Sequence, residues 1–172
     1  MLFSLSKINR HPKGLAVLFF TELWERFSYY GMRAILVLYL ISDFNDKNQG
    51  LGWSNKEAIM LYGWYTALVY IACIPGGIIG DRYITRINSV IYGGFLLCAG
   101  HFTLAFQNEL FFFTGLILII LGVGLLKPNI STLVGNLYKI NDLRRDQGFT
   151  IFYIGINVGA FLASIIVGYV GE

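Results

Sequence analysis

The chain has 172 residues, of which 56% are hydrophobic and only 13% are charged, and its formal net charge is +3. Soluble domains carry about 25% charged residues, so this composition excludes an ordinary soluble enzyme, and it is too apolar for a disordered chain. The basic residues stand at the ends of apolar segments, which argues against a nucleic-acid partner.

Five apolar stretches are long enough to cross a bilayer, which takes roughly 20 residues per helix. Short connectors join them, so there is no room for a separate catalytic domain. We therefore expect an all-α membrane protein with five transmembrane helices, no enzyme activity and no metal or cofactor site. In chain order, the predicted helices cover residues 14–41, 57–80, 89–106, 110–138 and 148–170.

The first predicted helix carries charges in its first half. Four polar residues are spaced i, i+4, i+7 and i+11 and therefore fall on one narrow stripe. They are Glu22, Arg26, Tyr29 and Arg33, and Glu25 and Tyr30 flank the stripe. A charge at the bilayer centre costs about 2.5–3.5 kcal/mol or more on insertion scales. The stripe therefore predicts a helix that lines a polar cavity instead of facing lipid.

The charge balance of this stripe indicates what the cavity could bind. Glu22 and Glu25 offset Arg26 and Arg33, and Lys127 of the fourth predicted helix adds a positive charge. Such a site can attract a substrate carboxylate, and an intramembrane glutamate beside an arginine can exchange a proton. The alternative is a buried Glu22–Arg26 ion pair that only fixes helix packing.

Proline and glycine mark the second and fourth predicted helices. Pro75 predicts a kink in the second helix, and Lys127-Pro128 predicts a break in the fourth. For Lys127 the alternative is a side chain that extends to the cytoplasmic surface. Small-residue faces allow close helix approach, and they are formed by Gly76, Gly77 and Gly80 and by Gly155 and Gly159.

The orientation follows from the basic residues in the connectors. With the N-terminus in the cytoplasm, eight of them lie inside and two outside. The eight are Lys7, Arg10, Lys13, Arg82, Arg86, Lys139, Arg144 and Arg145, and the two are Lys47 and Lys56. We expect a multi-pass protein of the inner (cytoplasmic) membrane, embedded in the lipid bilayer, with a cytoplasmic N-terminus.

Four motifs in order resemble signatures of the proton-dependent oligopeptide transporter (POT/PTR) family of the major facilitator superfamily. Residues 22–31, ELWERFSYYG, are similar to its ExxERFxYYG signature, and residues 76–82, GGIIGDR, resemble its loop between helices two and three. Residues 126–129, LKPN, resemble its fourth-helix motif, and residues 152–159, FYIGINVG, its FYxxINxG signature. Gly80 departs from the pattern, because the family usually has alanine there.

The resemblance implies two six-helix halves around a central cavity, which carry di- and tripeptides inward with protons by alternating access. Protons would be the coupling ion, with no other cofactor. The resemblance assigns proton coupling to Glu22, Glu25 and Arg26, peptide binding to Tyr29, Tyr30, Arg33, Tyr70, Lys127 and Asn157, and gating to Gly77, Asp81 and Arg82. Arg33 and Lys127 would bind the carboxylate of the peptide.

The five predicted helices fall one short of a six-helix half, so we expect the sixth helix and the C-terminal half to be absent from residues 1–172. The chain would then supply the N-terminal part of the cavity and need that C-terminal half as its partner. The alternative is a truncated membrane protein or gene remnant without transport activity. Within the family, nitrate or another solute is the alternative to peptides.

Overall fold

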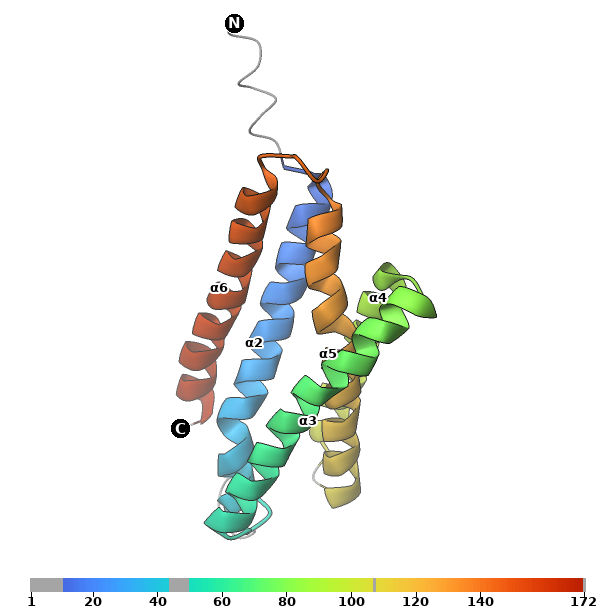
Figure 1. Cartoon of the computed structure of the whole chain (residues 1–172). Coiled ribbons are helices and arrows are strands. Elements are labelled where there is room, and N and C mark those ends of the chain that lie inside the picture. The colour runs from blue at the N-terminus through green and yellow to red at the C-terminus, as the bar shows by residue number, and fades with distance from the viewer. Residues whose placement is uncertain (1–10, 44–49, 107, 172) are drawn as a thin grey trace, which may run out of the picture. The chain divides into compact units, whose positions relative to one another are not determined.

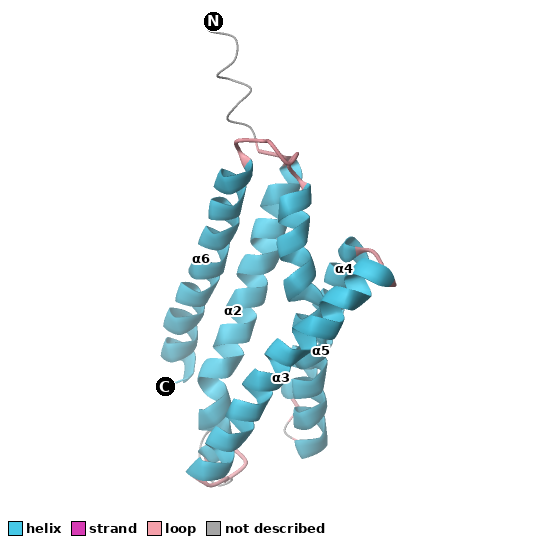
Figure 2. Ribbon diagram, viewed as in Figure 1, coloured by secondary structure: helices cyan, strands magenta, loops and turns pink. Residues whose placement is uncertain are grey.

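The computed structural model describes residues 11–43, 50–106 and 108–171, and its regular elements there are all helices (Figures 1 and 2). They are α2 (Lys13–Ile41), α3 (Asn55–Arg82), α4 (Arg86–Leu104), α5 (Glu109–Asn136) and α6 (Arg145–Gly171). This confirms the predicted fold class, and each helix end lies within three residues of its predicted place. Lys7, Arg10 and Lys47, which the orientation used, lie outside the described residues.

Four of these helices are long and apolar enough to cross a membrane, namely α3, α4, α5 and α6 up to Tyr169. The remaining helix, α2, has 29 residues. It carries four charged residues inside the helix, namely Glu22, Glu25, Arg26 and Arg33. The charges that mark α2 as unusual in the sequence thus set it apart in the structure too.

Local sequence explains where α3 and α4 begin. Ser54 caps α3 in a reciprocal capping box. The Glu57 carboxylate accepts a hydrogen bond from the Ser54 N–H at 3.1 Å, and the Ser54 hydroxyl accepts one from the Glu57 N–H at 3.4 Å. Thr85 caps α4 by accepting from the Asn88 N–H at 3.2 Å. Each cap satisfies a backbone donor that the first helical turn leaves unpaired.

The chain divides into two compact units. Of the described residues, those within Met1–Ile35 and Thr132–Glu172 form one unit, and those within Leu36–Ser131 form the other. In the first unit, α6 runs alongside the first part of α2 (Figure 1). A Cβ atom on Gly155 would lie 2.9 Å from the Phe19 ring, and one on Gly159 would meet the Leu23 carbonyl. These two predicted small residues therefore let the two backbones approach closely.

In the second unit, glycines of α3 and α4 pack against α5. A Cβ atom on Gly76 would collide with the backbone of Gly124, and one on Gly93 would lie 2.7 Å from the Gly122 carbonyl oxygen. The Asn129 side chain occupies the space that a Cβ atom on Gly80 would take. The predicted small-residue face of α3 is thus an interface between helices of this unit.

The predicted break at Lys127-Pro128 is wrong, because α5 continues as an α-helix through Pro128. Pro75 lies inside α3, and the kink expected there stays a prediction. Proline removes one backbone donor, and side chains can satisfy carbonyl groups near it. The Asn129 amide nitrogen donates to the Leu125 carbonyl at 2.8 Å and to the Gly76 carbonyl of α3 at 3.1 Å. The second of these bonds ties α5 to α3 one residue after the proline.

Candidate ion-coupling and substrate site

Arg26 lies between two carboxylates of its own helix. Its Nη2 donates to Glu25 Oε1 at 2.7 Å, its Nε pairs with Glu25 Oε2, and its Nε lies 3.2 Å from Glu22 Oε1. The exposed fractions are 3% for Glu22, 5% for Glu25 and 4% for Arg26. The three predicted proton-coupling residues therefore form one buried ion cluster with two negative charges and one positive charge.

Two tyrosines follow this cluster and contact a second arginine. The Arg26 guanidinium carbon lies 5.3 Å from the ring centroid of Tyr29 and 5.9 Å from that of Tyr30. The Arg33 guanidinium carbon lies 5.5 and 6.0 Å from the same two centroids. All four distances are within the range of cation–π attraction. The aromatic pair thus connects the ion cluster to Arg33.

The polar stripe on α2 was predicted to line a polar cavity along its whole length, and the structure differs in its first part. Its first part is buried, and the reason is α6, since a Cβ atom on Gly159 would lie only 3.1 Å from Arg26 Cβ. Tyr29 is also buried, with 2% of its surface exposed. Tyr30 and Arg33 remain partly exposed. Only this second part of the stripe is placed to meet a ligand directly.

Lys127 and Tyr70 form a separate pair in the other unit. The Lys127 ammonium lies 4.5 Å from the ring centroid of Tyr70, which is within cation–π range. Tyr70 is 54% exposed, and Lys127 is partly exposed. The structure thus brings together a predicted residue of α3 and one of α5.

Asn157 on α6 is exposed, and its side-chain amide donates to the Tyr153 carbonyl of the same helix at 3.0 Å. The buried positions of α6 near it are Phe152, Gly155 and Gly159, which lie on the side toward α2. At about 100° per residue, Asn157 is on the opposite side of α6 from these two glycines. Its place as a peptide ligand stays a prediction.

The predicted gating motif ends a helix. Asp81 and Arg82 lie in the last turn of α3, one and two residues beyond the predicted helix end. A Cβ atom on Gly77 would lie 3.6 Å from Pro128 Cβ. Asp81 Oδ1 pairs with Arg86 Nη2 of α4 at 2.8 Å. The motif therefore links the end of α3 to the start of α4, and its gating role stays a prediction.

Asn129 is a residue whose importance the sequence prediction missed. It is 2% exposed, and its side-chain amide links the predicted small-residue face of α3 to the Pro128 region of α5. The signal was present, because an asparagine inside an apolar helix is expected to bond to a neighbouring helix. Among the described residues, no group of three or more His, Cys, Asp or Glu side chains is placed to hold a metal ion.

The connector between α5 and α6 holds an ion pair outside the membrane-spanning segments. Arg144 donates to both carboxylate oxygens of Asp142, from Nε at 2.9 Å and from Nη2 at 2.7 Å. Hydrogen bonds from the Arg144 side chain and backbone lower the pKa of Asp142 to about 2. The same side-chain bond raises the pKa of Arg144. Asp142 therefore stays ionised at every ordinary pH.

Comparison with known proteins places these features in a family. The sequence profile of the POT family matches residues 87–172, which is half of the chain. The chain belongs to the POT family. The family named from the four sequence motifs is therefore confirmed.

The POT relatives are bacterial transporters. The chain is 51% identical over 162 residues to a di-/tripeptide transporter of Lactococcus lactis subsp. lactis, with 94% of the chain and 33% of the relative covered. It is 50% identical over 163 residues to the uncharacterized transporter YclF of Bacillus subtilis, with the same coverage of 94% and 33%. The chain thus spans about a third of the length of these relatives.

Solved POT structures share the fold of this chain. A peptide transporter POT in complex with sulfate superposes with a TM-score of 0.89 at 52% identity, covering 94% of this chain and 32% of that one. A POT family transporter in complex with 5-aminolevulinic acid gives a TM-score of 0.88 at 44% identity, covering 92% and 32%. The protein is therefore a multi-pass membrane protein of a transporter family, built from membrane-spanning helices.

Proposed function

We propose that this chain supplies the N-terminal part of the cavity of a POT transporter that carries di- and tripeptides together with protons by alternating access. The buried Glu22–Glu25–Arg26 cluster is the observation that carries the proposal. Two further cations, Arg33 and Lys127, lie on the helices that carry the predicted peptide ligands. The 51% identity to a di-/tripeptide transporter supports peptides as the substrate class.

Proton coupling would act through the charge of the cluster. With both glutamates ionised, Arg26 is held by two negative charges in a site that excludes water. A proton on either carboxylate removes one of them, and charges interact strongly in a low-dielectric interior. The net charge around Arg26, and around the two tyrosines that both Arg26 and Arg33 contact, then becomes more positive. Protonation and binding of an anionic substrate group would favour each other.

Peptide binding would use the partly exposed cations. Arg33 and Lys127 can each donate a charge-assisted hydrogen bond to a terminal carboxylate. Arg33 lies against two tyrosine rings and Lys127 against one, and such a ring holds the charged end of a flexible side chain without neutralising it. The amino terminus of the peptide would be bound by an acidic group of the C-terminal half.

The proposed location is the cytoplasmic membrane, with the N-terminus in the cytoplasm. Among the described connectors and helix ends, basic residues concentrate on the side that this orientation makes cytoplasmic. They are Lys13, Arg82, Arg86, Lys139, Arg144 and Arg145, against Lys56 on the other side. Labelling of Lys56 from outside the cell, with Lys139 protected, would test this orientation.

The proposed function is tested by Glu22→Gln, made in the protein as it occurs in its own membrane. We expect dipeptide uptake driven by a proton gradient to fall about tenfold or more, because the glutamine cannot exchange a proton. Exchange of labelled for unlabelled dipeptide without a gradient should persist, which shows that the variant folds. The exposed Glu109→Gln is the matched control and should transport normally. Unchanged gradient-driven uptake in Glu22→Gln would overturn the proton role.

A further inference from the structure

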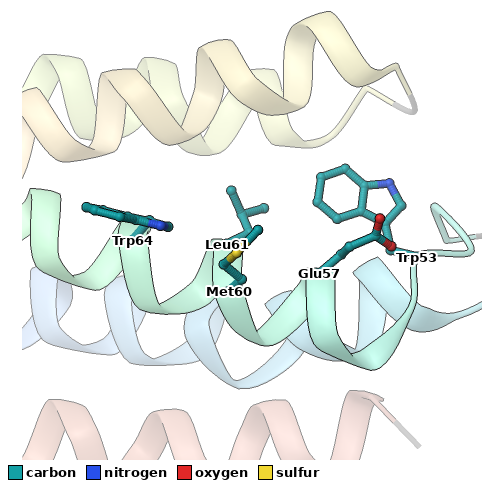
Figure 3. Close-up of a pocket in the computed structure, with 5 residues that line it drawn as sticks. All are labelled: Trp53, Glu57, Met60, Leu61 and Trp64. Atoms are coloured by element: carbon teal, nitrogen blue, oxygen red, sulfur yellow. The ribbon is translucent and has the colours of Figure 1, made fainter.

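A groove of about 320 Å³ lies at the start of α3, and none of the proposed transport residues lines it. It is lined by Trp53, Glu57, Met60, Leu61 and Trp64 (Figure 3). Figure 3 shows the two indole rings toward its two ends, with the glutamate, methionine and leucine between them. The groove therefore combines two aromatic surfaces, an apolar floor and one carboxylate.

The groove faces away from the proposed substrate ligands on the same helix. Glu57, Leu61 and Trp64 are spaced i, i+4 and i+7 and share one face of α3. Tyr70, which contacts Lys127, comes nine residues after Leu61 and so points about 180° away from it. Met60 is 57% and Trp64 is 64% exposed. Because α3 is long and apolar enough to span a membrane, this exposed apolar face can lie at the depth of a bilayer, where a lipid could reach the groove.

The Glu57 carboxylate in the groove can accept a further hydrogen bond. The Ser54 backbone N–H and hydroxyl both donate to Glu57 Oε2, at 3.1 and 2.6 Å. Oε1 takes no part in these two bonds and belongs to an exposed side chain. Indole rings attract ammonium groups, and tryptophans favour the headgroup level of a membrane. A negative charge beside two indoles favours a headgroup that carries an ammonium group over an anionic headgroup that has none.

The length of the groove fits a lipid. Glu57 and Trp64 are seven residues apart, which corresponds to about 10 Å along the helix. The headgroup layer on each side of a bilayer is roughly 5–8 Å thick. A ligand that reaches from Glu57 to Trp64 therefore has a polar end in that layer and an apolar body in the hydrocarbon.

We infer that this groove binds one aminophospholipid, with its primary ammonium at Glu57 between the indole rings and an acyl chain along Met60, Leu61 and Trp64. The neighbouring exposed Lys56 is the cation next to Glu57 in the chain and is available to the lipid phosphate. The site lies apart from the proposed transport site, so each can fail without the other.

Lipid selectivity of the protein purified from its own membrane tests the inference. After delipidation, phosphatidylethanolamine or phosphatidylglycerol with identical acyl chains is added, and bound lipid is counted by native mass spectrometry. We expect the protein to prefer phosphatidylethanolamine. Glu57→Gln should reduce this preference about fivefold to tenfold, because glutamine removes the charge yet still serves in a capping box. The exposed Glu109→Gln should keep it. An equal preference for phosphatidylethanolamine in Glu57→Gln and Glu109→Gln would overturn the inference.

A tryptophan pair gives an independent measurement. Trp64→Leu should weaken phosphatidylethanolamine binding, whereas Trp24→Leu should not, although Trp24 on α2 is equally exposed at 62%. Equal effects of the two substitutions would contradict a defined site. Millimolar ethanolamine or a dipeptide, added as competitor, should leave the lipid bound. Displacement by either would show that the groove takes a soluble amine and would overturn the lipid assignment.

Discussion

At the scale of single residues, Arg26 shows how a chain can bury a cation inside a membrane protein. Desolvation of a guanidinium is expensive, and the two glutamates one and four residues before it supply the compensating charge from the same helix. A cluster that only fixes helix packing and a cluster that couples transport to protons would therefore contain the same ion pairs. They differ in what happens when one carboxylate is protonated.

Removal of Arg26 should be costly for stability. Arg26→Leu leaves two buried carboxylates without their cation, and breaking a buried pair in this way costs about 3–5 kcal/mol. The measurement is thermal or denaturant unfolding of the purified protein. The exposed Arg82→Leu is the matched control and should change stability little. Similar losses in the two variants would show that the Arg26 pairs contribute nothing specific.

Asp142 should show its lowered pKa directly. Its folded-state pKa of about 2 lies below the ordinary value of 3.8. The pair with Arg144 therefore adds stability above pH about 4, and this contribution is lost as the pH falls through about 2. A carboxyl titration followed by NMR should give a midpoint near 2, and Arg144→Gln should move it upward. A wild-type midpoint close to 3.8 would contradict the bidentate pair.

At the scale of helices, small residues decide which surfaces meet. The lack of a side chain at Gly159 lets α2 approach α6 closely, and the lack of one at Gly76 does the same for α5 and α3. Asn129 adds a polar bond at the second contact, next to a proline that leaves α5 unbroken. Without a hydrophobic driving force between helices in lipid, such close packing and bonding supply the association energy.

A pair of glycine substitutions on α6 tests this packing. Gly159→Ala places a methyl group against the Leu23 carbonyl and Arg26 Cβ, and we expect a loss of about 1–3 kcal/mol. A Cβ atom on Gly168 has no neighbour within 4 Å, so Gly168→Ala should be neutral or stabilising because alanine favours helix. Unfolding of the two variants under identical conditions is the measurement. Equal stability would mean that α6 does not pack closely at Gly159.

At the scale of the whole molecule, the predicted ligands are spread over two units. Arg33 with its tyrosines belongs to one, and Lys127 with Tyr70 belongs to the other. The chain also spans about a third of its relatives, at 33%. The peptide ligands of the proposed function therefore come from both units.

Lys127 should discriminate peptides by their carboxyl end. A charge-assisted hydrogen bond is worth about 1.5–3 kcal/mol, so Lys127→Gln should raise the KM for uptake of a dipeptide about tenfold to a hundredfold. The C-terminal amide of the same dipeptide should compete equally well against wild type and variant. Lys139→Gln, in the exposed α5–α6 connector, is the control. A loss that is equal for the acid and the amide would contradict carboxylate binding.

Much of this protein was predictable from local patterns. Apolar length located the helices, because a membrane span must satisfy its own backbone bonds and so must be a long helix. The i, i+4, i+7 spacing put Glu22, Arg26 and Tyr29 on one face, since helix geometry is local. The motifs sufficed for the family. The bond from the Asn129 amide to the Gly76 carbonyl of α3 was not predictable in this way, because it depends on which helices meet.

The remaining features depend on which surfaces meet in three dimensions. Burial of the Glu22–Glu25–Arg26 cluster follows from the approach of α6 at Gly159, more than a hundred residues later in the chain. The groove on α3 arises because a loop tryptophan, Trp53, and a helical one, Trp64, line the same hollow. Periodicity assigns a residue to a face of its helix, but what covers that face is set by contacts between distant segments.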